Sequence, residues 1–188
     1  IHATTDCEFS GRSNTLYSKD ALKDAYDVYG KSKILASDYL LKSKNCHVIR
    51  TSIIGFELDG KRSLLEWFLN NKSKKINGFS DHWWNGITTL EWAKIAHKII
   101  NQKINDNLIQ VGTDPVSKFD LLNIFNEIFE TKYIIIENNT GDNIFKCLKS
   151  DFELKTIRDQ IIELKNWYQY YHHLMAVQLL PNLTISFY

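Results

Sequence analysis

The sequence predicts an α/β fold built mainly from parallel strands. Segments with the apolar spacing of helices alternate with short β-branched and aromatic segments along the 188 residues. This alternation favours parallel pairing, because two neighbouring parallel strands need a long connection between them, usually a helix. The composition, with 44% hydrophobic and 24% charged residues, is that of a globular chain able to bury a core. We therefore expect one domain or slightly more.

The first third of the chain predicts strand, loop, helix and strand in that order. Residues 1–5 have the character of the end of a strand, and the polar residues 10–20 predict a loop. Residues 26–44 predict a helix, because apolar side chains recur there at helical spacing. Residues 46–54 predict a single strand, which a glycine-containing loop follows.

Three later helices each begin with a capping box, in which a side-chain oxygen and a following acid satisfy free backbone amides. They are predicted to end near residues 71, 102 and 130, and a last helix is predicted at 157–170. Short strands are predicted at 75–77, 108–111 and 133–137. The capping pairs are Ser63 with Glu66, Thr88 with Glu91, and Ser117 with Asp120. This pattern gives the three hydroxyls a structural role.

Composition excludes several classes of function. The net charge of +1 gives no reason to expect nucleic acid or an anionic membrane as a partner. No apolar run approaches the ~20 residues of a membrane helix. The cysteines, Cys7, Cys46 and Cys147, are odd in number and lack the spacing of a zinc site. We therefore expect a cytoplasmic protein without a disulfide framework or a bound metal. His172 and His173 also give no metal site, because they lack metal-ligand spacing.

Glycine spacing excludes a standard dinucleotide-binding turn within these residues. No two of the eight glycines are closer than five positions, so the pattern G-x-G-x-x-G does not occur. Residues 55–62 come close to a phosphate-binding loop, but Arg62 stands where Ser or Thr would bind magnesium. Glu57 and Asp59 would also repel a phosphate. We interpret this segment as a surface loop.

Tyr29 and Lys33 are the residues that suggest a reaction. They are four positions apart in a predicted helix, so their side chains share one face. A phenol has an ordinary pKa of ~10, and a neighbouring ammonium makes it a better proton donor near neutral pH by favouring the phenolate. About one such pair is expected by chance among nine tyrosines, so an ordinary helix surface is the alternative interpretation.

Three motifs in a fixed order strengthen the interpretation. TTDCEFSG stands at residues 4–11, YGKSK at 29–33 and RTS at 50–52. This set resembles the extended short-chain dehydrogenase/reductase superfamily, most closely its branch of dTDP-4-dehydrorhamnose reductases and related nucleotide-sugar reductases. Residues 77–89 resemble the loop that leads into the substrate-side helix of that family. The resemblance runs from residue 1 to about residue 165.

The resemblance implies a catalytic set of Thr5, Tyr29 and Lys33. Tyr29 would protonate the carbonyl oxygen, Thr5 would hydrogen-bond the same oxygen, and Lys33 would support Tyr29 and hold the nicotinamide ribose. Residues near NADP or NAD would also include Thr4, Ser52 and Ile53. Residues near the nucleotide sugar would be Asp6, Cys7, Glu8, Trp84 and Asn85, with Trp83 and Trp84 able to stack on a base or sugar. A partly buried aromatic pair is the alternative for the two tryptophans.

The resemblance also implies an incomplete fold. The chain would hold the C-terminal portion of a Rossmann-type NAD(P)-binding fold and a smaller α/β substrate-binding region. Residues 1–55 would belong to the catalytic domain and 56–170 mostly to the substrate region, with elements returning to the main sheet; residues 171–188 form an unassigned tail. The N-terminal glycine-rich βαβ is absent, and we expect it to precede Ile1, since a chain without it lacks the pyrophosphate site.

The implied reaction is NAD(P)H-dependent reduction of a 4-keto-6-deoxy nucleotide sugar, in the supply of surface polysaccharide. A homodimer is compatible with the resemblance. Glu8 departs from the family, which usually has a small apolar residue there beside the substrate. Two alternatives stay open: an epimerase or dehydratase of the same superfamily, and a non-catalytic binding module or gene fragment.

Overall fold

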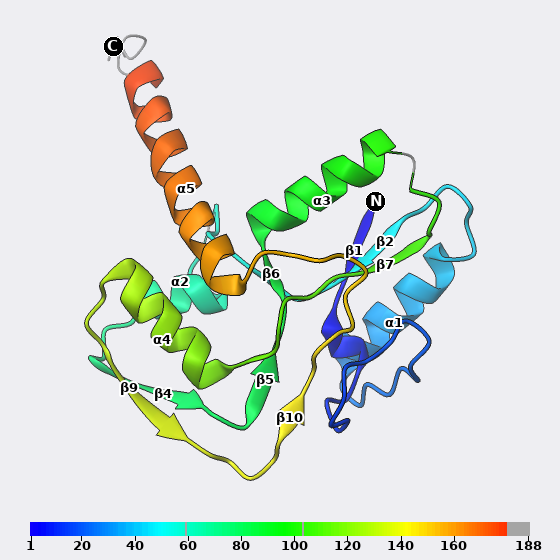
Figure 1. Ribbon diagram of the computed structural model, residues 1–188, viewed down its shortest axis with the longest axis horizontal. Helices are drawn as coiled ribbons and strands as arrows, with labels where there is room; N and C mark the ends of the chain where they lie inside the picture. Colours follow the sequence, from blue (N-terminus) through cyan, green and yellow to red (C-terminus); the bar gives the residue numbers. More distant parts are fainter. Residues whose placement is uncertain (59, 103, 180–188) are drawn as a thin grey trace, which may run out of the picture.

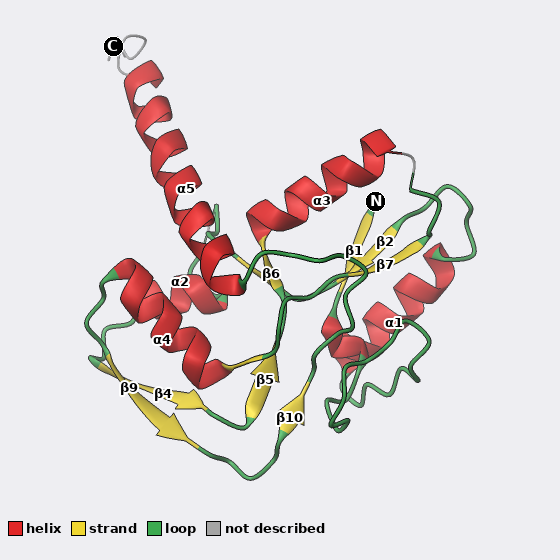
Figure 2. Cartoon of the chain, viewed as in Figure 1, coloured by secondary structure: helices red, strands yellow, loops and turns green. Residues whose placement is uncertain are grey.

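The computed structural model describes residues 1–58, 60–102 and 104–179. Its strands form two three-stranded and two two-stranded sheets. Every strand pair among the described residues is parallel except the pair of residues 82–84 with residues 116–117. The chain therefore has the predicted α/β class, with helices and strands alternating along it (Figure 2).

The first sheet holds β1 (His2–Thr4), β2 (Val48–Arg50) and β7 (Leu108–Gln110). In Figure 1 it lies between α1 (Val28–Leu40) and α3 (Thr89–Gln102). The α3 side is apolar, because β-branched residues of the sheet meet isoleucines of the helix. The buried residues of that cluster are Ile49, Ile87, Ile95, Ala96, Ile99, Ile109 and Val111.

Helix α1 is shorter than residues 26–44, which the sequence predicted. Asp27 caps the helix, since its carboxylate accepts a hydrogen bond from the Gly30 amide at 2.7 Å. A Cβ atom at Gly30 would lie 2.3 Å from the Cys7 carbonyl oxygen. Only glycine therefore allows α1 to approach the short 3₁₀ helix η1 (Asp6–Glu8) this closely.

Residues 46–54 form two strands where one was predicted. After β2 the chain leaves the first sheet, and β3 (Ile53–Ile54) pairs with β6 (Ile87–Thr88) instead. The Ser52 carbonyl accepts a hydrogen bond from the Ile87 amide at 2.9 Å across this junction. The sequence predicted one strand because residues 46–54 form a continuous strand-like run. Periodicity does not identify the neighbouring strand, so the change from β1 to β6 as partner could not be predicted.

The second part of the chain surrounds a larger apolar core. Strand β4 (Lys75–Phe79) pairs with β9 (Ile134–Asn138), close to the predicted positions of both. The three-stranded sheet contains β5 (His82–Trp84), β8 (Val116–Ser117) and β10 (Ile144–Phe145), which were not predicted because each is so short. Helices α2 (Leu64–Leu69), α4 (Lys118–Phe129) and α5 (Ile157–Leu179) pack around Leu65, Phe68, Leu121, Phe125 and Ile161.

Two of the three predicted caps are confirmed. The Thr88 hydroxyl accepts from the Glu91 amide at 3.2 Å, and the Ser117 hydroxyl accepts from the Asp120 amide at 3.0 Å. The Ser63 prediction is wrong, since this side chain makes no capping bond. The Glu57 carboxylate instead accepts from the amides of Arg62 and Ser63. The protein's own Glu57 carboxylate thus accepts the amide hydrogen bonds that a phosphate would accept in a phosphate-binding loop.

Helix α5 is longer than predicted, because it continues beyond residue 170 to Leu179. Its C-terminal half extends away from the rest of the chain in Figure 1. Stacking of Phe56 on Tyr168, with ring centroids 3.9 Å apart, anchors its middle. No helix among the described residues is both long and apolar enough to cross a membrane. The predicted tail lies partly outside the description, which ends at residue 179; the side chains of His172 and His173 also lie outside it.

Gln160 joins α5 to the start of α3, and its replacement is expected to destabilise the fold. Its side-chain oxygen accepts from the Thr88 amide at 3.1 Å, and the side chain is 1% exposed. Gln160→Leu leaves that amide unpaired and should lower the free energy of unfolding by about 1–3 kcal/mol in urea titration. Gln169→Leu, on an exposed position of the same helix, is the control and should change it little. Equal losses in both variants would contradict this assignment.

Candidate functional site

A pocket of about 400 Å³ lies at the carboxyl ends of β1 and β2, beside the start of α1. Ligands of parallel α/β sheets commonly bind at this edge. The pocket contains all three predicted catalytic residues and five further predicted site residues. The residues that line it are Ala3, Thr4, Thr5, Asp6, Cys7, Tyr29, Lys33, Thr51, Ser52 and Ile53.

Tyr29 and Lys33 lie on the helical side of the pocket. The Lys33 ammonium is 5.6 Å from the centroid of the Tyr29 ring, so the two side chains are neighbours on one helix face. Tyr29 is 54% exposed, which leaves its phenol accessible from the pocket. Among the described residues, Lys33 has no carboxylate partner. Its ammonium is therefore free to meet an incoming group.

Thr5 lies on the strand side of the pocket. Its hydroxyl donates to the Asp6 carboxylate at 2.9 Å and accepts from the Cys7 amide at 3.1 Å. The side chain thereby caps η1, and its oxygen is held in one place. The Thr5 hydroxyl proton points toward the Asp6 carboxylate. Thr5 can donate this proton to another group only when the Asp6 carboxyl no longer accepts it.

Burial controls the protonation of the groups around Thr5. It raises the pKa of Asp6, although hydrogen bonding to Thr5 and the positive charges of Lys146 and Lys118 partly oppose it. Burial and then the charge of Asp6 raise the pKa of Cys7. The same two causes raise the pKa of Cys147 to about 12. Cys7 therefore has the character of a packing residue of the pocket wall and not of a nucleophile.

Glu8 does not contact the pocket, contrary to the prediction that it lies beside a substrate. Its side chain is completely buried and faces Arg50, which is also buried. Arg50 Nη2 and Glu8 Oε2 are 2.9 Å apart, close enough for an ion pair although the two groups are not aligned for a hydrogen bond. Glu8 Oε1 accepts from the Thr4 hydroxyl at 2.6 Å. Its contacts are internal to the protein.

Trp84 and Asn85 also lie away from the pocket. Trp84 is 7% exposed and belongs to the core between α2, α4 and α5. Asn85 is 2% exposed; its amide donates to the carbonyls of Thr113 and Leu148, and its oxygen accepts from the Leu148 amide. All the polar atoms of its side chain thus have protein partners, which gives Asn85 a structural role. Trp83 is half-buried near Phe145.

The sequence prediction did not name two residues of the pocket, Ala3 and Thr51. Both lie near the ends of strands that carry predicted residues, with Ala3 in β1 and Thr51 directly after β2. The pairing of Thr4 with Arg50 brings these two strand ends together. A parallel alignment of the two predicted strands would have found them, because parallel strands end at the same edge.

The pocket suits the nicotinamide-ribose end of NADP or NAD. A free ammonium, a phenol and hydroxyls can bond a ribose diol and a carboxamide, and about 400 Å³ leaves room for a ring. The glycines of the sequence are too far apart for the standard pyrophosphate-binding turn. In the described part of the loop at residues 55–62, Glu57 accepts the amide hydrogen bonds that a phosphate would take. The residues present thus fit one end of the cofactor.

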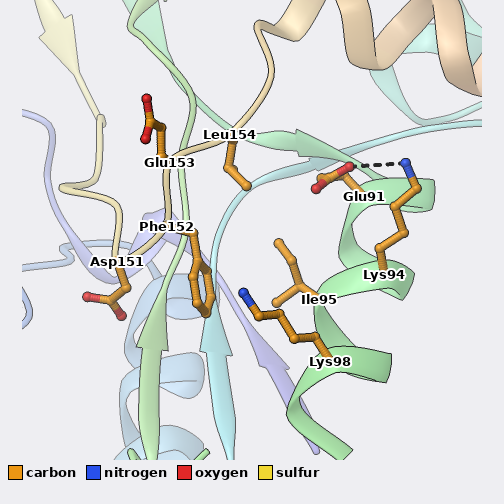
Figure 3. Close-up of a pocket in the computed structure, with 8 residues that line it drawn as sticks. All are labelled: Glu91, Lys94, Ile95, Lys98, Asp151, Phe152, Glu153 and Leu154. Carbon is orange, nitrogen blue, oxygen red and sulfur yellow. Dashed lines mark hydrogen bonds and ion pairs between the residues drawn. The ribbon is translucent and has the colours of Figure 1, made fainter. Parts of the chain in front are cut away.

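Another pocket, of about 330 Å³, lies between α3 and residues 151–154 (Figure 3). Ile95 and Phe152 form its apolar part, with the Lys98 ammonium 4.8 Å from the centroid of the Phe152 ring. Glu91 and Lys94 form an ion pair at its rim. It contains none of the predicted site residues.

The structural role of Asn85 can be tested by measuring the stability of a variant that lacks its side-chain amide. Asn85→Ala would leave three backbone groups without a partner, of which the two of Leu148 are buried, and should lower the free energy of unfolding by on the order of 3 kcal/mol in urea titration. The control is Asn101→Ala, on the exposed surface of α3, which should cost far less. A stable Asn85→Ala protein would contradict the structural role.

Asp6 predicts a pH dependence of stability. Because burial raises its pKa in the folded state, the folded protein holds the proton more tightly than the unfolded chain above the ordinary value of 3.8. Stability should therefore fall as pH rises from 3.8 through the raised pKa, and Asp6→Asn should remove this slope.

Urea unfolding from well below pH 3.8 up to pH 7 measures this effect together with its control. Asp24→Asn is the control of opposite sign: burial favours a higher pKa for Asp24, but hydrogen bonds from Ser10 outweigh it and lower the pKa. The stability that Asp24 provides should be lost as pH falls below 3.8 toward its lowered pKa. Parallel stability curves for the parent and Asp6→Asn would contradict the assignment.

The fold was compared with solved structures. The dTDP-4-dehydrorhamnose reductase of Clostridium acetobutylicum matches with a TM-score of 0.76 at 15% identity over 89% of this chain and 65% of that one. The Bacillus anthracis dTDP-4-dehydrorhamnose reductase, solved with NADP, matches with a TM-score of 0.75 at 12% identity over 87% and 63%. A dTDP-glucose 4,6-dehydratase of B. anthracis, solved with NAD, matches at 0.67 and 14% identity over 89% and 60%.

Sequence comparison with protein-family models and with curated proteins finds no match. The chain spans less than two thirds of the length of these solved structures. The likeness therefore lies in the fold. Over that part of their length, the chain has the Rossmann-like α/β fold shared by the dTDP-4-dehydrorhamnose reductases and the related dehydratases and epimerases of their superfamily.

Proposed function

We propose that this chain supplies the proton-delivery and sugar-side part of an NAD(P)H-dependent reductase that acts on the keto group of a 4-keto-6-deoxy nucleotide sugar. The observation that carries the proposal is the pocket in which Thr5, Tyr29 and Lys33 meet at the carboxyl ends of two parallel strands. The pyrophosphate of the cofactor would be bound by a glycine-rich segment outside these 188 residues, which we propose precedes Ile1.

Tyr29 is the proposed proton donor. Its exposed phenol belongs to the pocket lining, and the Lys33 ammonium beside it stabilises negative charge on the phenol oxygen as the proton leaves. Lys33 has a second role in the proposal, since an ammonium without a carboxylate partner can bind the hydroxyls of a ribose. Thr4, Ser52 and Ile53 would contact the cofactor from the strand ends. NADPH or NADH supplies hydride to the carbonyl carbon when bound.

Thr5 and Asp6 are the proposed partners of the carbonyl oxygen on the strand side. Burial raises the pKa of Asp6 and so favours its protonated form. A protonated carboxyl donates to Thr5 Oγ1 across the 2.9 Å contact, which leaves the Thr5 proton for the substrate oxygen. Two donors, Tyr29 and Thr5, then stabilise the charge that develops on that oxygen. Cys7 would pack beside the sugar.

The proposal is tested with a polypeptide that joins this chain to its glycine-rich segment. Supplied with NADPH and dTDP-4-dehydrorhamnose, it should consume the cofactor with loss of its absorbance. No consumption by folded protein that binds NADPH would contradict the proposed reaction. Isomerisation or dehydration of a nucleotide sugar without net consumption would favour an epimerase or dehydratase instead.

Tyr29→Phe should lower kcat by roughly 10²–10⁴-fold, because it removes the proton donor and keeps the ring. Tyr26→Phe is the matched control: Tyr26 is 64% exposed just before the same helix and is not part of the pocket lining. It should keep the parent kcat. A Tyr29→Phe rate within threefold of the parent would remove Tyr29 from the mechanism.

A further inference from the structure

Glu8 carries a buried charge at a position where the resembled family usually has a small apolar residue. Its carboxylate meets three groups: the Thr4 hydroxyl at 2.6 Å, Arg50 Nη2 at 2.9 Å and Lys23 Nζ at 3.7 Å. The Glu8 carbonyl also accepts from the Ala25 amide at 3.2 Å. Side chain and backbone of Glu8 are therefore both fixed.

Stability alone does not explain this arrangement. Removing a carboxylate and a guanidinium from water costs free energy that their attraction repays only in part, and apolar pairs often replace such pairs without loss. Losing one partner is costly, however, because the other charge is left buried and unpaired. The role of the pair is therefore to be sought in the geometry that it imposes.

The geometry concerns the wall of the pocket. The hydrogen bond from Thr4 to Glu8 closes a short loop of chain, and the three residues inside the loop, Thr5, Asp6 and Cys7, all line the pocket. Arg50 ties this loop to β2, and its Nη1 donates to the Gln110 side chain of β7 at 2.9 Å. The side-chain amide nitrogen of Gln110 in turn donates to the backbone carbonyls of Tyr17 and Lys149. The wall is thus braced across the whole sheet.

We propose that Glu8 is a positioning residue, which closes the loop of residues 4–8 and ties it to Arg50 so that Thr5 and Asp6 face the carbonyl oxygen of the substrate. The part of this inference that concerns catalysis rests on the proposed function. The part that concerns the pocket wall does not, since Cys7 reports the closure of the loop in this chain alone.

Alkylation of the cysteines by iodoacetamide, followed peptide by peptide in a mass spectrometer, tests the loop. Glu8→Gln removes the charge at nearly constant volume and should raise the alkylation rate of half-buried Cys7 at least fivefold. Half-buried Cys46, distant in sequence from the loop, is the control and should stay within twofold. Buried Cys147 is no control, because the charge of Asp6 in the loop acts on it.

Thr4→Val keeps the side-chain shape and loses only the hydrogen bond to Glu8, so it decides the matter if Glu8→Gln does not fold. It should raise the Cys7 rate in the same direction by a smaller factor. An unchanged Cys7 rate would overturn the inference. So would a rise shared by Cys46, because it would mean that Glu8 only stabilises the fold.

Kinetics of the joined polypeptide give the second readout. Glu8→Gln should lower kcat for the keto sugar at least tenfold while its KM for NADPH changes less than threefold. Glu163→Gln, which breaks the surface ion pairs of Glu163 with Lys94 and Lys155, should leave both constants unchanged. A Glu8→Gln enzyme with the parent kcat would overturn the inference. An inactive parent together with the Cys7 response would overturn the proposed function and leave the role of Glu8 in the pocket wall supported.

Discussion

The buried ion pair between Glu8 and Arg50 is the contact on which the geometry of the pocket depends. Arg50 cannot lose its charge and has no exposed surface, so the protein has to provide its partners. It does so from both sides, with Glu8 after β1 and Gln110 in β7. Thr4, Arg50 and Gln110 occupy one row of the sheet. Glu8 joins the Thr4 side chain to Arg50, and Arg50 donates to Gln110.

The pocket lies directly after this row, at the carboxyl ends of β1 and β2. Because the three strands are parallel, the residues after them gather at one edge, and η1 turns Thr5, Asp6 and Cys7 toward the space beside α1. Gly30 lets the helix approach η1, which brings Tyr29 and Lys33 to the opposite side of that space. Burial of Asp6 in this wall raises its pKa.

The sequence predicted the local structure well where the governing rule is local. Helical spacing places Tyr29 and Lys33 on one face whatever surrounds the helix, and two capping boxes begin helices at Thr88 and Ser117 as expected. It failed where the outcome depends on distant partners. Ser63 lost its cap to Glu57, the strand at 46–54 split between two sheets, and Trp84 and Asn85 proved to be internal.

By itself the sequence determined the α/β class, the order of most elements, the absence of a standard dinucleotide-binding turn and the pairing of Tyr29 with Lys33. Each of these follows from spacing along the chain, which short-range geometry translates directly into structure. Only the tertiary structure decided that Glu8 is a buried partner of Arg50 and that Asp6, which the sequence placed near the sugar, is buried with a raised pKa. Burial of a charge depends on contacts between elements that are far apart in the sequence, such as β1, β2 and β7. No local sequence pattern predicts such contacts.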